Sequence, residues 1–324
     1  MEFILPFHIK PSAEKITYRQ KLLFMGSCFT EEIGNQFKNL KFDVLQNPNG
    51  ILYDPRSIAY ALISYVENRK YNESDLFLQD EIWHSWQHHS AFSGLDKNQV
   101  LDKIIRSQSE ANTFLQQASW LVITLGTSYN YQLKSNNDFV ANCHKASAAF
   151  FSKKLIALDE IRLQISDAIG KLQLFNPNLK IVFTISPVRH VRDGIIENNR
   201  SKARLIEAVH SIAEENKNVF YFPAYELVID VLRDYRFYKS DLVHATEASV
   251  SYVFEKFCEA YLDDSSKKLL LDLQSLLSAM NHRPFQKESD KYKRFLKGQL
   301  ERAKKIKEAY AGIDLANEIK YFSK

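Results

Sequence analysis

Two short polar segments of the sequence could supply a nucleophile and the base that activates it. The first is Gly26-Ser27, which lies between the apolar run Leu22–Met25 and the amphipathic stretch Glu31–Leu40. The run is typical of a buried strand and the stretch has helical spacing, so Ser27 is expected at a strand-to-helix junction. In an open α/β sheet such a junction faces the ligand crevice, and the first N–H groups of the helix can bind a developing oxyanion. The alternative interpretation of Ser27 is a simple helix N-cap, a position that serine favours.

The second segment is Asp241-Leu242-Val243-His244, near the end of the α/β pattern. A serine hydroxyl is a weak nucleophile unless an adjacent base removes its proton, and that base needs a third group to orient it. Asp and His three residues apart can share one turn, with the carboxylate on the imidazole Nδ1–H and Nε2 facing the nucleophile. We therefore predict Ser27 as the nucleophile, His244 as the base and Asp241 as the group that orients it. Alone, Asp-x-x-His is more often a polar cluster at a helix N-terminus, so the combination with Ser27 carries the prediction.

Nearby cysteine and histidine residues receive structural interpretations. Cys28 follows Ser27, and adjacent side chains on a turn point apart, so only one of the two can face His244. Cys28 is expected to be a small buried hydrophobic residue. His84 and His88 have the i, i+4 spacing of metal ligands, but the aromatic alternation around them is not helical, so no metal site is predicted.

Four residues are predicted to contact the substrate: His89, His144, Arg189 and His190. His89 belongs to a segment rich in Trp and His, which is suited to stack on and hydrogen-bond a sugar or a polar acceptor. The other three follow strand-like segments and are expected near the same edge of the sheet. No cofactor is expected, because the sequence lacks Gly-x-Gly-x-x-Gly and Gly-x4-Gly-Lys-Ser/Thr motifs and the chemistry requires none.

The elements that must position these residues follow an α/β pattern. Apolar runs alternate with helical stretches of ten or more residues, which predicts a mostly parallel, flavodoxin-like sheet with helices on both faces, a three-layer α/β/α sandwich. The predicted strands are Leu22–Met25, Phe42–Leu45, Trp120–Leu125, Lys180–Ile185 and Val219–Phe222. The predicted helices are Glu31–Leu40, Arg56–Glu67, Ser152–Phe175 and Asn199–Glu215.

Two regions fall outside this alternation. Asp75–Gly94 mixes alternating aromatic residues with histidines and is predicted to be a β-hairpin or long loop inserted in the fold. Residues 265–324 are helical by pattern, Leu-rich and then Lys-rich, with no strand signal. We expect an α/β domain over residues 1–264 and a helical C-terminal extension over residues 265–324.

The composition excludes several classes of protein. Of the 324 residues, 45% are hydrophobic and 13% aromatic, which provides a large core and excludes a disordered chain. The net charge of +4 comes from the basic residues after Phe285, so the rest of the chain offers no basic face to nucleic acid. Three widely spaced cysteines (Cys28, Cys143 and Cys258) form neither a disulfide framework nor a zinc motif. Without a signal peptide or a long apolar run, we expect a cytoplasmic protein with no membrane or nucleic-acid partner.

The segment Gly26-Ser27-Cys28-Phe29 resembles the motif after which the GSCFA family is named, a relative of the SGNH/GDSL hydrolases. Further segments, within a resemblance that extends from about Phe3 to Phe285, are similar to the same family: Asn47–Tyr53, Thr124–Ser128, Asn142–Lys145 and Ser186–His190. The resemblance implies an SGNH-like sandwich with Ser27, His244 and Asp241 in its catalytic triad.

The resemblance also implies an oxyanion hole. In SGNH enzymes a glycine after the second strand donates a backbone N–H, a role that Gly50 matches beside the N–H of Ser27. The third donor is the Asn of a Gly-x-Asn-Asp motif, but this sequence has Gly126-Thr127-Ser128-Tyr129 there. The replacement donor is either Thr127, by position, or Asn142, by chemistry, since the loss of a donor typically costs about 100- to 1,000-fold in rate.

These residues predict a serine esterase that hydrolyses a small-molecule or carbohydrate ester through an acyl-enzyme. An O-acylated carbohydrate is one candidate substrate, and the sequence does not identify the acyl group. The missing Gly-x-Asn-Asp motif leaves two alternatives open. One is a non-catalytic glycan- or peptide-binding module on the same scaffold. The other is a glycan O-acyltransferase in which the loop His89–Gly94 holds the acceptor.

Overall fold

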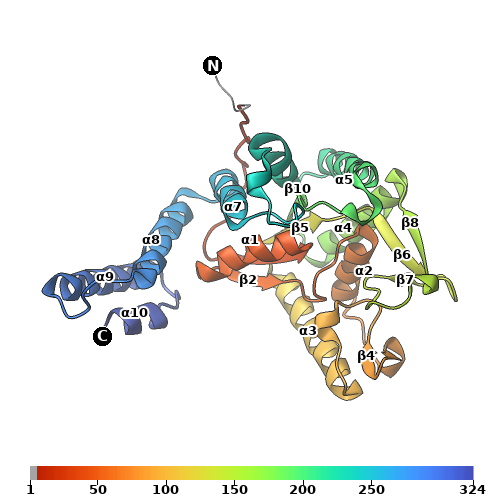
Figure 1. Ribbon diagram of the computed structural model, residues 1–324, viewed down its shortest axis with the longest axis horizontal. Helices are drawn as coiled ribbons and strands as arrows, with labels where there is room; N and C mark the ends of the chain where they lie inside the picture. Colours follow the sequence, from red (N-terminus) through yellow and green to blue (C-terminus); the bar gives the residue numbers. More distant parts are fainter. Residues whose placement is uncertain (1–5, 324) are drawn as a thin grey trace.

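A five-stranded parallel sheet forms the centre of the computed structural model, which describes residues 6–323 (Figure 1). Across the sheet the strands are β10 (Val219–Tyr221), β9 (Lys180–Ile185), β5 (Trp120–Leu125), β1 (Lys21–Gly26) and β2 (Asp43–Gln46). All four pairings are parallel. In chain order this is the flavodoxin-like arrangement, in which the direction of strand addition reverses between β1 and β5. A ligand crevice is therefore expected at the carboxyl ends of these two strands.

Helices cover both faces of the sheet. Successive side chains of a strand point to opposite faces, so Leu22 and Phe24 of β1 join one core while Leu23 and Met25 join the other. The first core is closed by α1 (Cys28–Asn39) and α7 (Glu247–Tyr261). The second is closed by α2 (Pro55–Val66), α3 (Lys97–Gln117), α4 (Leu158–Phe175) and α5 (Ile195–Glu215). The three-layer α/β/α prediction is confirmed.

One predicted helix is only partly correct. The stretch predicted as the helix Ser152–Phe175 begins as strand β8 (Phe151–Leu155), and α4 starts only at Leu158. β8 pairs antiparallel with β6 (Tyr129–Leu133), which also pairs with β7 (Phe139–Val140). The partner of β8 is a strand formed well upstream in the chain, so the local periodicity of the sequence could not identify it.

The inserted segment forms a small hairpin beside α3. Strands β3 (Phe77–Gln79) and β4 (Ile82–His84) pair antiparallel, which confirms the hairpin interpretation of Asp75–Gly94. Trp83 also exchanges backbone hydrogen bonds with Gly94, and this closes the segment onto itself.

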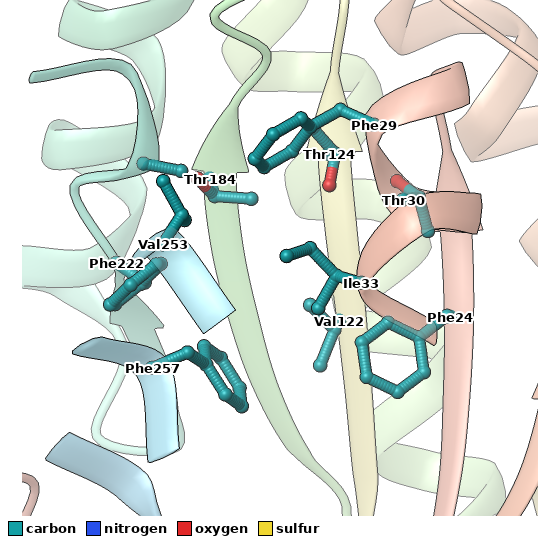
Figure 2. Close-up of a pocket in the computed structure, with 11 residues that line it drawn as sticks. Phe24, Phe29, Thr30, Ile33, Val122, Thr124, Thr184, Phe222, Val253 and Phe257 are labelled. Carbon is teal, nitrogen blue, oxygen red and sulfur yellow. The ribbon is translucent and has the colours of Figure 1, made fainter. Parts of the chain in front are cut away.

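The layer between the sheet and α1 is closely packed. Figure 2 shows Phe29, Thr30 and Ile33 of α1 pointing towards the sheet, where they face Val122 and Thr124. The gap that they enclose with α7 measures about 10 Å³, the space of one water molecule. The face of α1 that carries Phe29 and Ile33 therefore packs in the core.

Three helices follow the sandwich: α8 (Asp264–Asn281), α9 (Asp290–Ala309) and α10 (Ala316–Phe322). In Figure 1 they extend to one side of the sheet. Leu269, Leu273 and Leu276 of α8 are buried in the same core as α1 and α7. Between residues 6 and 323, none of the helices combines the length and the apolar character that crossing a bilayer requires.

Candidate active site

The chain leaves β1 and enters α1 through a turn that requires glycine. Gly26 has a φ of +132°, and a Cβ there would lie 2.1 Å from the carbonyl oxygen of Thr124 on the neighbouring strand β5. The N–H of Ser27 then donates to that same oxygen at 3.1 Å, so the parallel pairing continues one residue beyond the strand. The side-chain oxygen of Asn47 accepts the N–H of Gly26 at 2.9 Å. These contacts fix where α1 begins.

Ser27 occupies the N-cap position of α1, but its side chain makes no capping hydrogen bond. It is only 1% exposed, and its Oγ is buried without a hydrogen-bond partner among residues 6–323. Neither the predicted contact with His244 nor the simple capping role is present in this arrangement. The nucleophilic role of Ser27 stays a prediction.

A pocket of about 690 Å³ opens at the carboxyl edge of the sheet. Cys28, the first residue of α1, contributes to its wall, as does His244 from the loop before α7. The remaining walls come from the loops after β2, β5 and β9 and from the small antiparallel sheet with its connections. This is the crevice that the strand order predicts, with a thiol and an imidazole in the same pocket.

Asp241 and His244 form the predicted pair. Oδ2 of Asp241 lies 2.7 Å from Nδ1 of His244, and Oδ1 accepts the N–H groups of Val243 and His244 at 2.9 and 3.0 Å. These hydrogen bonds, that from the His244 N–H first, hold the pKa of Asp241 at about 2. An ionised carboxylate only accepts, so the neutral imidazole carries its proton on Nδ1 and its lone pair on Nε2. The imidazole is therefore oriented to act as a base.

The turn that carries this pair is strained. Leu242 has a φ of +59°, a left-handed conformation that costs a residue with a Cβ about 1–2 kcal/mol. The N–H of Leu242 donates to the carbonyl of Lys239, and the N–H of Lys239 donates to the carbonyl of His244. These bonds close the turn and hold Asp241 beside His244.

The two predicted backbone donors of the oxyanion hole are already engaged. The N–H of Ser27 donates to Thr124, and that of Gly50 donates to the carbonyl of Asn47 at 2.6 Å. Their involvement in the fold does not fit the predicted role, because an N–H committed to a carbonyl is not free for an oxyanion.

Of the two predicted replacement donors, one lines the pocket. Thr127 does so, but its hydroxyl lies 3.1 Å from Oγ of Ser201 and accepts the N–H of Tyr129. Asn142 is absent from the pocket wall, and its Oδ1 accepts the N–H of His144. Thr127 is the better placed of the two.

Two of the four predicted substrate-binding residues line the pocket. Arg189 and His190 line the pocket, whereas His89 and His144 do not. His144 is buried against the inserted hairpin, where its Nε2 lies 2.8 Å from the carbonyl oxygen of Ser85, and burial lowers its pKa to about 4. His89 accepts the N–H of Ala91 and so caps a short 3₁₀ turn. Both histidines stabilise the insert instead of facing the pocket.

Comparison with known proteins identifies the chain's family. The GSCFA family model matches residues 21–257, and the C-terminal domain of GSCFA domain proteins matches residues 273–324. The chain belongs to the GSCFA family.

The similarity of the chain to curated proteins and to solved structures is weak. No curated protein matches this GSCFA chain significantly. Among solved structures it is similar to an acetyl xylan esterase (Est2A) from the rumen bacterium Butyrivibrio proteoclasticus, with 12% identity and a TM-score of 0.39. The alignment covers 75% of the GSCFA chain and 63% of the esterase, so the chain spans less than two thirds of that enzyme's length.

The GSCFA pocket contains groups that the sequence did not single out. Its aromatic wall consists of Tyr53, Tyr129, Tyr131 and Phe151. Lys153 and Arg192 add positive charge beside Arg189. Lys153 pairs with Asp193, whereas Arg189 has no carboxylate partner in the described chain and lies over the ring of Tyr238 at 4.0 Å. Aromatic faces and guanidinium groups together are suited to sugar rings and polar substituents.

A buried lysine lies behind this pocket. Lys202 of α5 is 2% exposed, and its Nζ donates to the carbonyl oxygens of Gly126 and Ser186 at 2.7 and 2.6 Å. Burial lowers its pKa to about 7, while the charge of Cys28 acts in the opposite direction. Its spacing from Leu205, Val209 and Ile212 on α5 could have placed it on the buried face from the sequence alone.

Proposed function

We propose that this GSCFA protein hydrolyses esters through a covalent acyl-enzyme formed at the N-terminus of α1. The observation that carries the proposal is the Asp241–His244 pair, because His244 lines the same pocket as Cys28, the first residue of α1. In the reaction His244 removes the proton of the nucleophile, which attacks the ester carbonyl. His244 then protonates the departing alkoxide and activates the water that releases the acid.

The substrate that fits this pocket best is an O-acylated carbohydrate. Tyr129 and Tyr131 line the pocket beside Lys153, whose Nζ lies over one face of each ring and leaves the other face for a sugar, and the guanidinium groups of Arg189 and Arg192 offer donors for its oxygens. A pocket of about 690 Å³ has the size of typical small-molecule sites, which supports a short substrate over a polymer bound along its length.

Turnover of p-nitrophenyl acetate and of an acetylated monosaccharide tests the proposal. Relative to wild type, His244→Ala is expected to lose about 10³-fold or more in kcat, because the base and acid of both half-reactions is removed. His282→Ala is the matched control, since His282 caps the end of α8 in the C-terminal extension. A folded wild-type protein that releases no acid from either ester would contradict the proposal, and saturable binding of the sugar without turnover would favour a binding module.

The sequence-based assignment of the nucleophile to Ser27 is tested in the same assay with Ser27→Ala. If Ser27 is the nucleophile, this variant should lose as much activity as His244→Ala.

A further inference from the structure

We propose that the nucleophile of this site is the thiol of Cys28 and that Ser27 is a structural residue of the strand-to-helix turn. The inference rests on the proposed acyl-enzyme function and specifies the atom that carries the acyl group. It changes the chemistry from an oxyester to a thioester intermediate.

Cys28, and not its neighbour Ser27, reaches the pocket. Cys28 lines the pocket together with His244, whereas Ser27 does not and is only 1% exposed. Figure 2 shows that Phe29 and Ile33 form the core face of α1. Cys28 is outside that face, lines the pocket and lies close enough to Glu31 for the carboxylate to raise its pKa. A substrate carbonyl in the pocket meets sulfur before it could meet the buried Oγ of Ser27.

The backbone N–H groups that could stabilise an oxyanion suit an intermediate on Cys28 better than one on Ser27. The N–H of Ser27 is bonded to the carbonyl of Thr124, so an intermediate on Ser27 could not use it. Cys28 and Phe29 are the first two residues of α1, where N–H groups have no partner within the helix. An acyl group on sulfur would hold its oxyanion next to these two donors and the positive end of the helix dipole.

The electrostatic setting of the thiol makes it depend on His244. Burial raises the pKa of Cys28, and the N–H groups of Phe29 and of Cys28 itself act against that rise. The thiol is therefore largely protonated at neutral pH and depends on His244 to remove its proton. The charge of Cys28 raises the pKa of the buried Lys202 against the effect of burial, so the two side chains interact electrostatically. Lys202 is accordingly a positioning residue, because it also holds the carbonyls of Gly126 and Ser186.

The steps balance without another reactant. The thiol proton passes to Nε2 of His244 while the S–C bond forms, and the ester C–O bond breaks as that proton moves to the alkoxide. Water then gives a proton to Nε2 as its oxygen bonds to the acyl carbon. The S–C bond breaks, and sulfur recovers the proton from His244.

The test locates the acyl group directly. Wild type and the variants Ser27→Ala and Cys28→Ala are mixed with p-nitrophenyl acetate, quenched in acid, and analysed by peptide mass spectrometry with and without neutral hydroxylamine. We expect one acetyl group on Cys28 in wild type and Ser27→Ala, cleaved by hydroxylamine as a thioester is. We expect none in Cys28→Ala, together with a loss of about 10³-fold or more in kcat.

Two results would overturn the inference in different ways. An acetyl group on Ser27, resistant to hydroxylamine and still present in Cys28→Ala, would leave the proposed function intact and refute the thiol. A wild type that neither hydrolyses the ester nor becomes acetylated would refute both.

Alkylation by iodoacetamide adds a readout that needs no acyl recognition. Cys143 lines the same pocket, and burial raises its pKa to about 11, so it is an internal comparison within one chain. We expect Cys28 to react at least about tenfold faster than Cys143, and we expect this advantage to disappear in His244→Ala. Equal rates for the two thiols, or a Cys28 rate independent of His244, would contradict the role of Cys28.

Discussion

Oδ2 of Asp241 lies 2.7 Å from Nδ1 of His244, while the second oxygen of the same carboxylate accepts the backbone N–H of His244. One acid thus fixes both the ring and the backbone of its partner. This arrangement needs only a single turn, which explains why it is already apparent from the spacing of the two residues.

Asp241→Asn should therefore impair turnover much more than folding. The amide can still accept the backbone N–H groups, but if its NH₂ faces Nδ1 it favours the tautomer in which Nε2 is protonated and cannot act as a base. We expect kcat/KM to fall by about 10³- to 10⁴-fold, measured with p-nitrophenyl acetate. The circular dichroism spectrum should not change, and a variant with near wild-type turnover would exclude Asp241 as the orienting group.

Gly26 and Gly170 provide a matched pair of substitutions. In Gly26→Ala the new Cβ would lie 2.1 Å from the Thr124 oxygen at a φ of +132°, so we expect the free energy of unfolding to fall by about 3 kcal/mol or more. Gly170 lies within α4 with no neighbouring atom within 4 Å of its added Cβ, so Gly170→Ala should stabilise the protein by about 0.5–1 kcal/mol. Urea denaturation measures both, and equal effects would contradict the close approach of β1 to β5.

The buried Lys202 should make stability depend on pH in the alkaline range. Its folded pKa is about 7, whereas the unfolded chain has a lysine pKa of about 10.4. Between these values only the unfolded state binds the proton, so the contribution of Lys202 to the free energy of unfolding rises with pH, by up to about 1.4 kcal/mol per unit. Below pH 7 both states are protonated and the contribution is constant.

Lys202→Met isolates this effect. The variant should be less stable than wild type, because two buried carbonyls lose their donor. The difference in free energy of unfolding between wild type and Lys202→Met should increase from pH 7 to pH 9 in urea denaturation experiments. Parallel pH profiles would show that the amine does not change its protonation on unfolding.

His88 should also make stability rise with pH, but in the acid range. It is buried against Phe92 and Tyr71 with its Nδ1 2.9 Å from Oγ of Ser85, and burial lowers its pKa to about 3. The unfolded chain takes up this proton near pH 6.5, so stability falls as the pH drops from about 6.5 towards 3, by up to about 1.4 kcal/mol per unit. His88→Gln should be less stable at pH 7 but should have a flatter profile. An unchanged slope would assign the acid sensitivity to other groups.

Features that depend on near neighbours in the chain could be predicted from the sequence. Trp120–Leu125 and Lys180–Ile185 have the bounds predicted for them, because strands buried on both faces appear as continuous apolar runs. The Asp241–His244 contact likewise spans three residues. The site at the carboxyl edge of the sheet followed from the alternation of strands and helices alone.

The tertiary structure decided what depends on distant segments. β8 became a strand because β6 lies beside it, although its sequence continues a helical pattern. His144 lies against the inserted hairpin and not in the pocket, because its Nε2 contacts the carbonyl oxygen of Ser85. Most consequentially, the packing of Phe29 and Ile33 on the sheet sets the rotation of α1, and this brings Cys28 and not Ser27 into the pocket with His244. Two adjacent side chains have the same sequence context, so only the packing of the helix can distinguish them.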